Sequence, residues 1–178
     1  MFGFGKKSKI ELAKKINELS INAAEQFLNY LKEDVIIYDK CINENPIKNT
    51  SVIFIINIYR DILNSKYASK DVFSVIYTSV TSLASNKTTE ELFMNTLMEY
   101  INACNQSVEY YKGLPNFDIA TVLTKVYFSL VLDDREYVQN QLEGEILETI
   151  SYKKIYNYIS GILKNTTILN EDYNLKIK

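Results

Sequence analysis

The sequence contains no histidine and no tryptophan, and only two cysteines, five glycines and two prolines among its 178 residues. The absence of histidine excludes Ser-His-Asp and Cys-His catalysis, imidazole proton transfer and every metal site that needs a histidine ligand. Two cysteines cannot supply the four thiolates of a structural zinc site or an iron–sulfur cluster within one chain. The scarcity of glycine and proline argues against collagen and against a β-sandwich with many turns.

Long hydrophobic runs are also missing. The longest, at 52–56, is far shorter than the roughly 20 apolar residues that a membrane-spanning helix needs. Residues 1–7 lack the apolar segment of a signal peptide and predict a flexible N-terminal arm, although Phe2 and Phe4 with the nearby lysines could contact a membrane surface or a partner. We therefore expect a cytoplasmic protein with both cysteines reduced.

The composition indicates one globular domain. Hydrophobic residues make up 47% of the chain and charged residues 24%, at a length close to that of a typical single domain. Ile, Asn, Lys and Tyr together account for 72 residues, and lysine outnumbers arginine by 18 to 2. Because all four have AT-rich codons, this bias predicts a low-GC bacterium or its phage as the source, and it is an alternative explanation for the many tyrosines.

Apolar residues recur at helical spacing along most of the chain. Ser8 and Glu11 predict a capping box at the start of the first helix, and Thr88 and Glu91 predict a second one. The expected helix ends depend on individual residues, namely Ser69 and Asp118 as N-caps and Gly113 as a C-terminal glycine.

Residues 50–65 are ambiguous. The run at 52–56 is rich in β-branched residues, as a buried strand would be, but no partner strand is evident. Ile55, Ile58 and Ile62 continue at helical spacing, so we expect a helix that is buried on most sides. The predicted fold is a single all-α bundle of six or seven helices over 8–164, between the arm at 1–7 and a polar C-terminal tail at 165–178.

The charge is unevenly distributed, although the net charge is only −2. Residues 88–148 hold three basic and eleven acidic residues, a net charge of −8. Such a block is either a solvated helix surface or a docking surface for a basic partner. No basic patch that would favour nucleic acid is evident.

Catalytic candidates are few. Glu145 and Glu148 are spaced for one helix face and could hold Mg²⁺, as in the Glu-x-x-Glu of all-α nucleotide pyrophosphohydrolases, but the later Glu-x-x-Asp of that pattern is missing. Ser151 and Lys154 match the Ser-x-x-Lys of serine acyl enzymes without its supporting motifs. Cys104 lies on the apolar stripe of its predicted helix, which indicates burial rather than reactivity.

We therefore expect a non-catalytic, protein-binding protein that uses no metal and no cofactor. In its compact, acidic, histidine-free and all-helical format the chain resembles immunity proteins, which bind and neutralise a toxin; no diagnostic motif accompanies the resemblance. The alternatives are a metal-dependent all-α phosphohydrolase and a structural scaffold. The residues expected to contact a basic partner are acidic, with one possible aromatic anchor: Asp133, Asp134, Glu136, Tyr137, Glu143 and Glu145.

Overall fold

The computed structural model describes residues 7–38, 44–132, 148–165, 167–171 and 173–178. In these ranges the protein is an all-α bundle, as predicted, with six helices of at least 13 residues and no β-strand. The long helices are α1 (Lys9–Lys32), α3 (Glu44–Asn64), α4 (Ser69–Leu83), α5 (Lys87–Tyr111), α6 (Ile119–Val131) and α8 (Ile150–Lys164). Two single-turn helices complete the described chain, α2 (Val35–Tyr38) and α9 (Thr167–Asn170).

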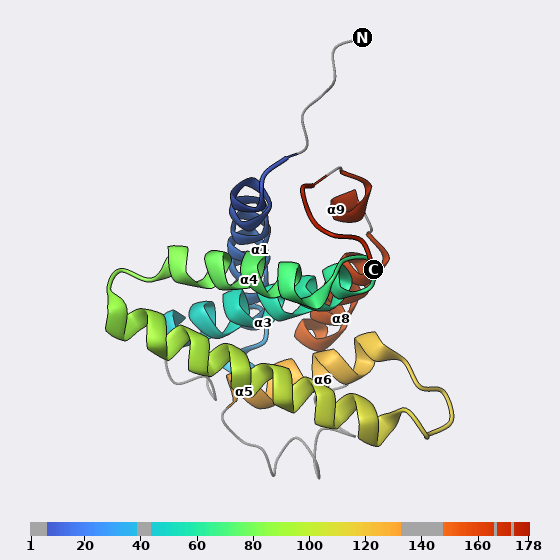
Figure 1. The fold of residues 1–178 in the computed structure, drawn as a ribbon. Helices are drawn as coiled ribbons and strands as arrows, with labels where there is room; N and C mark the ends of the chain where they lie inside the picture. Colours follow the sequence, from blue (N-terminus) through green and yellow to red (C-terminus); the bar gives the residue numbers. More distant parts are fainter. Residues whose placement is uncertain (1–6, 39–43, 133–147, 166, 172) are drawn as a thin grey trace.

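Helix α3 is the centre of the bundle. It packs against α1, α4, α5 and α6, and it lies between α4 and α5 in Figure 1. All nine residues at 51–59 are buried, so this stretch has no solvent-facing side. The ambiguous segment at 50–65 is thus helical, as predicted, because a helix satisfies its own backbone hydrogen bonds when neighbours surround it.

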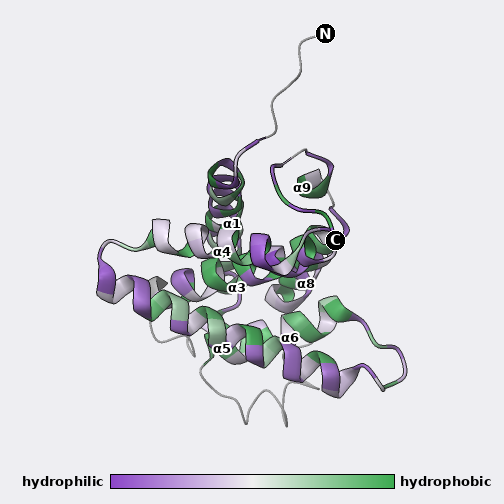
Figure 2. Ribbon diagram, in the orientation of Figure 1, coloured by the Kyte–Doolittle hydropathy of each residue, from purple (hydrophilic) through white to green (hydrophobic). Residues whose placement is uncertain are grey.

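The other helices are amphipathic and turn one face to this centre. In Figure 2 the two ends of α5 are hydrophilic, whereas its middle, which carries the buried Leu97, Tyr100 and Cys104, is more hydrophobic. Helix α8 packs against α1 and α6, where Ile155 and Ile159 are fully buried. One hydrophobic core therefore runs through the described helices.

Two buried polar contacts fix how helices pair. Between α1 and α4, the Asn17 amide donates to Ser79 O at 3.0 Å and to Ser82 Oγ at 2.7 Å, and Ser79 Oγ donates to Asn17 Oδ1. Between α3 and α6, Ser51 Oγ and Tyr127 Oη are 2.8 Å apart. Each pair is satisfied in only one relative placement of its helices, which makes a shifted packing costly.

The structure confirms two of the helix N-caps that the sequence predicts. Ser8 and Glu11 form the predicted capping box, and the Asp118 carboxylate accepts from Ala120 N and Thr121 N. Ser69 is not an N-cap, because the preceding Ala68 holds that position without a side-chain hydrogen bond. The second capping box was also placed wrongly, since Asn86 caps α5 by accepting from Thr89 N at 2.9 Å.

Gly113 does follow the last residues of α5, but the left-handed backbone conformation falls elsewhere. Lys112 is the C-cap, and among the described residues only Asn116 has a positive φ, of 62°. Asparagine is one of the few non-glycine residues that tolerate this conformation. The left-handed residue of the connection to α6 is therefore Asn116, which follows Pro115, and not the glycine.

The C-terminal segment is packed against the bundle, in contrast to the polar tail that we expected from residue 165. Ile168, Tyr173 and Leu175 are buried and belong to the core. Asn174 N donates to Lys7 O at 2.9 Å, and Ala68 N donates to Lys176 O at 2.8 Å. We call residues 167–171 and 173–178 the clasp, because they link the start of α1 to the α3–α4 turn (Figure 1).

Glu171 is the ionic centre of the clasp. Its carboxylate accepts from Lys7 Nζ at 2.7 Å, from Lys15 Nζ and from Tyr173 Oη at 2.6 Å. The hydrogen bonds from Lys15, Lys7 and Tyr173 lower the pKa of Glu171 to about 2. The charged form of this one side chain therefore connects the two ends of the described chain.

Asn17→Ala should lower the free energy of unfolding by about 1–3 kcal/mol, because it leaves the buried Ser79 hydroxyl without its partner. Urea denaturation at neutral pH measures the change. Asn102→Ala on the exposed side of α5 is the matched control and should cost less than about 0.5 kcal/mol. Equal losses in the two variants would mean that the α1–α4 contact does not contribute to stability.

The clasp should weaken in acid. Because the pKa of Glu171 is lower in the folded protein than its ordinary value of 4.5, its contribution is present above that value and is lost as pH falls toward about 2. Urea midpoints measured from pH 6 down to pH 3 should therefore fall less steeply in Glu171→Gln than in the wild type. Glu91→Gln, an exposed carboxyl on α5, should retain the wild-type slope.

Candidate functional site

The partner-binding residues predicted from the sequence lie outside the described residues. Asp133, Asp134, Glu136, Tyr137, Glu143 and Glu145 all fall within 133–147, between α6 and α8. Of the carboxylates near this segment, Glu148 is described and is exposed. The acidic surface therefore stays a prediction, as does the pairing of Glu145 with Glu148.

The Ser-x-x-Lys pair does not form a catalytic dyad. Ser151 is fully buried and donates to Asp34 Oδ2 at 3.1 Å, while Lys154 pairs with Glu33 and lies 5.3 Å from the centroid of the Tyr30 ring. Both side chains thus attach α8 to the end of α1. Within the part of the chain that the structure describes, no three carboxylates or thiols come close enough to hold a metal ion.

Cys104 is buried, as predicted, with 2% of its surface exposed. Burial raises the pKa of its thiol to about 12, and the nearby Asp61 acts in the same direction, while Arg60 and Asn57 oppose the shift. A thiol in this environment is a poor nucleophile at neutral pH. Cys41 lies outside the described residues.

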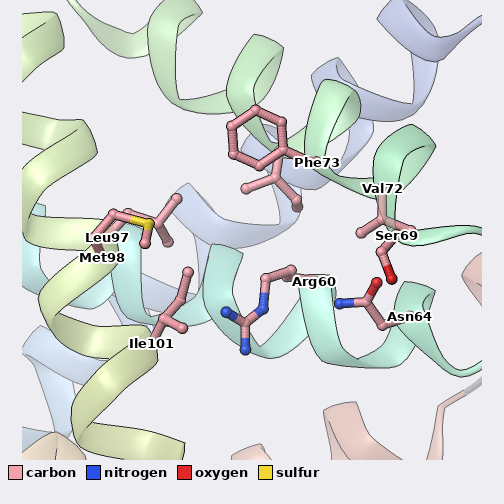
Figure 3. A pocket seen from close by; sticks show the side chains of 9 residues that line it. Arg60, Asn64, Ser69, Val72, Phe73, Leu97, Met98 and Ile101 are labelled. Atoms are coloured by element: carbon pink, nitrogen blue, oxygen red, sulfur yellow. The ribbon is translucent and has the colours of Figure 1, made fainter.

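A groove between α3, α4 and α5 is the candidate binding site that the structure adds. It encloses about 280 Å³. Six apolar and three polar side chains line it, in the order Arg60, Asn64, Ser69, Val72, Phe73, Ile76, Leu97, Met98 and Ile101. Figure 3 shows Met98 beside Leu97 on the α5 side of the groove, Phe73 on the α4 side, and Arg60 below Phe73.

Arg60 gives the groove a single positive charge. Its side chain is 15% exposed, and its Nε and Nη2 donate to Asp61 Oδ1 at 3.0 and 2.5 Å. No carboxylate is among the lining residues. The groove therefore combines apolar walls with one arginine, whose charge is paired with the adjacent Asp61.

A second feature lies at the connection between α5 and α6. Tyr110, Leu114, Phe117 and Ile119 are each at least 40% exposed, within ten residues of the chain. We call these four residues the corner. The Tyr110 and Tyr111 rings are perpendicular to each other with centroids 5.0 Å apart, and Lys125 lies over Tyr111. Exposed aromatic and aliphatic side chains so close together are typical of contact surfaces.

The sequence did not predict the groove, because three helices form it. The detectable signal at the groove was weak, namely Phe73 and Met98 outside the buried stripes of α4 and α5. In the corner, Ile119 follows the N-cap Asp118 directly and is 42% exposed. The helical spacing of apolar residues identifies the buried face of one helix, but it does not reveal a groove that lies between three helices.

None of the described helices is long and apolar enough to cross a membrane. Comparison with protein-family models, with curated proteins and with solved structures gives no significant match to this chain.

Cys104 should react with thiol reagents only when the protein unfolds. In a Cys41→Ser background at pH 8, a pKa of about 12 leaves about one thiol in ten thousand ionised, and burial blocks access to the rest. A chromogenic disulfide reagent should therefore label the native protein slowly and the urea-unfolded protein at once. Rapid native labelling would contradict the burial of this thiol.

Proposed function

We propose that the protein is a non-catalytic binding module that neutralises or regulates a protein partner, as immunity proteins do. The observation that carries the proposal is the corner, where Tyr110 is 74% exposed, and Leu114, Phe117 and Ile119 are also exposed. Tyrosine and phenylalanine contribute large contact areas with few rotatable bonds, and they are enriched at interfaces for that reason.

The charge of the surrounding chain supports a basic partner. The corner belongs to residues 88–148, whose net charge is −8. Acidic side chains around an apolar contact attract a basic surface over several ångströms, raise the association rate and disfavour nucleic acid. Asp133, Asp134, Glu136, Glu143 and Glu145 are our proposed acidic rim, with Tyr137 as a further anchor.

A metal-dependent phosphohydrolase and a structural scaffold are the competing functions. The first needs Glu145 and Glu148 to hold Mg²⁺, so it predicts a Mg²⁺-dependent rise in melting temperature that Glu145→Gln and Glu148→Gln abolish. The second predicts partners whose activity does not change on binding. Both outcomes differ from the neutralisation of one basic partner.

The proposal predicts one partner at the corner. A photo-crosslinking amino acid in place of Leu114, introduced in the source cells, should capture a single protein, and one in place of Ile10 on α1 should not. With the purified pair, the double variant Tyr110→Ser, Phe117→Ser should weaken binding at least about tenfold, because it removes two exposed aromatic contacts. Ile10→Ser is the matched control, since Ile10 is 59% exposed and lies outside the corner.

The acidic rim has its own test. Binding should weaken as salt is raised from about 50 to 500 mM. The double variant Asp133→Lys, Glu136→Lys should lower the association rate by a larger factor than it changes the dissociation rate. Binding that ignores both salt and these charge reversals would exclude the electrostatic mechanism even if the partner is real. A captured partner whose activity is unchanged would favour the scaffold.

A further inference from the structure

Two exposed aromatic rings lie beside the groove between α3, α4 and α5. Phe73 is 57% and Tyr77 is 43% exposed, and their rings stack with centroids 6.2 Å apart. Tyr77 Oη donates to Glu90 Oε1 on α5 at 2.7 Å, which fixes this ring against the neighbouring helix. We call Phe73 and Tyr77 the ridge. Because the ridge is already ordered, little side-chain entropy is lost when another surface covers it.

The groove beside the ridge is small and mainly apolar. Its apolar walls are formed mainly by Val72, Ile76, Leu97 and Ile101. The charge of Arg60 is paired with Asp61, so the groove has no unpaired charge that a charged ligand would match. Its volume of about 280 Å³ lies just below the usual range of roughly 300–1,000 Å³ for drug-sized ligands. A hollow of this kind suits an apolar side chain from another protein surface.

The ridge and the groove adjoin, so one face of the protein carries both a projection and a hollow. Phe73 belongs to both, because it also lines the groove on the α4 side, and Met98 lies beside Leu97 on the α5 side (Figure 3). Met98 is 47% exposed. When a two-fold axis relates two copies, the same patch meets itself, so each projection can enter the hollow of the other copy. A thioether against an aromatic ring is a favourable contact in such an arrangement.

The exposed charges on this face are also complementary between two copies. Lys70 precedes Phe73 by three residues and Tyr77 by seven, so helical spacing places it on the same side of α4 as the ridge. Glu91 precedes Met98 by seven residues, which places it on the same side of α5 as Met98. Both are exposed, and neither forms an ion pair among the described residues. If α4 of one copy lies against α5 of the other, a lysine therefore approaches a glutamate at two places in the dimer.

We propose that the protein forms a symmetric dimer through this face, with Phe73 of each copy in the groove of the other copy. Lys70 of each copy then lies near Glu91 of the other. A basic partner of the kind proposed above gains no charge attraction from a groove whose arginine is already paired. Tyr110 lies twelve residues beyond Met98, about 120° further round α5, so the dimer leaves the corner free and goes beyond the proposed function.

Analytical ultracentrifugation of the full chain measures the association. Because only a few exposed side chains form the contact, we expect a dissociation constant of about 10–100 µM, at the weak end of specific interfaces. The mass should be that of the 20.6 kDa monomer at about 5 µM and approach twice that value at about 500 µM. Unfolding experiments at low micromolar concentration therefore report on the monomer.

Three variants locate the interface. Phe73→Ser should weaken the dimer at least about tenfold, because it removes the side chain that enters the groove. Met98→Gln, on the α5 side of the same face, should also weaken it. Leu92→Ser is the matched control, since Leu92 is 60% exposed but lies about 120° round α5 from Met98, and it should leave the dissociation constant unchanged. Circular dichroism confirms that each variant is folded.

A charge swap tests the relative placement of the two copies. Lys70→Glu and Glu91→Lys should each weaken the dimer about threefold to tenfold, because each brings like charges together at two places. The double variant Lys70→Glu, Glu91→Lys restores opposite charges across the two-fold axis, so its dissociation constant should return close to the wild-type value. A general loss of packing would not be reversed by the second substitution.

Photo-crosslinking identifies the contact directly. A photoreactive phenylalanine analogue replaces Phe73, and ordinary chains are mixed with isotopically heavy chains at a concentration where the dimer forms. Light should then join an ordinary chain to a heavy one, with the new bond at Leu97, Met98 or Ile101 of the second copy. The mixed isotopes distinguish this product from a bond to the groove of the same chain.

Several results would overturn the proposal. These are a monomer mass over the whole concentration range, a dissociation constant that Phe73→Ser leaves unchanged, and a charge swap that restores nothing. A dimer that Tyr110→Ser with Phe117→Ser abolishes would place the contact at the corner instead. Crosslinking of position 73 in the source cells only to a different protein would assign the groove to that protein. Because dimerisation is measured on the purified chain alone, it can fail while partner capture at the corner succeeds, and the reverse.

Discussion

The complete burial of residues 51–59 in α3 is the constraint on which the bundle depends. A helix with no exposed side needs neighbours in every direction, and α1, α4, α5 and α6 provide them. It also fixes where α3 can meet solvent. Arg60 is the first residue after the buried stretch, so the burial of its predecessors places the guanidinium at the boundary between core and groove. The position of the one cation in the groove thus follows from the packing of the core.

The helices were predictable because their signals are local. Apolar spacing identified α3 as a helix despite its β-branched residues, and the caps at Ser8 and Asp118 are set by residues three or fewer positions away. The prediction of a cap at Thr88 failed because several cap-forming residues adjoin there, and the prediction at Ser69 failed because α4 begins after Ala68, which has no capping side chain. At α5 the N-cap is Asn86, two residues before Thr88.

The features that the sequence did not predict depend on contacts between residues that lie far apart in the chain. The clasp has no helical period, and its buried Tyr173 and Leu175 reveal their role only beside Lys7 and Tyr67, more than 100 residues away along the chain. The groove likewise needs α3, α4 and α5 together. The acidic residues at 133–145 were visible as composition, which predicts an electrostatic field but not a shape. Local sequence patterns therefore predicted the helices and the distribution of charge, whereas the surfaces formed between helices could be identified only from the fold.

The clasp imposes an order on folding during synthesis. Ribosomes make the chain from its N-terminus, and helices can pack as soon as their partners have emerged. The start of α1 is made long before the clasp, yet Lys7 and Lys15 meet Glu171, and Lys7 pairs with Tyr173, only when the clasp has been added. Until then the core surface that Ile168, Tyr173 and Leu175 cover stays open to water. A ribosome that stalls after α8 would therefore leave a helical bundle with an exposed apolar surface, which chaperones and proteases recognise.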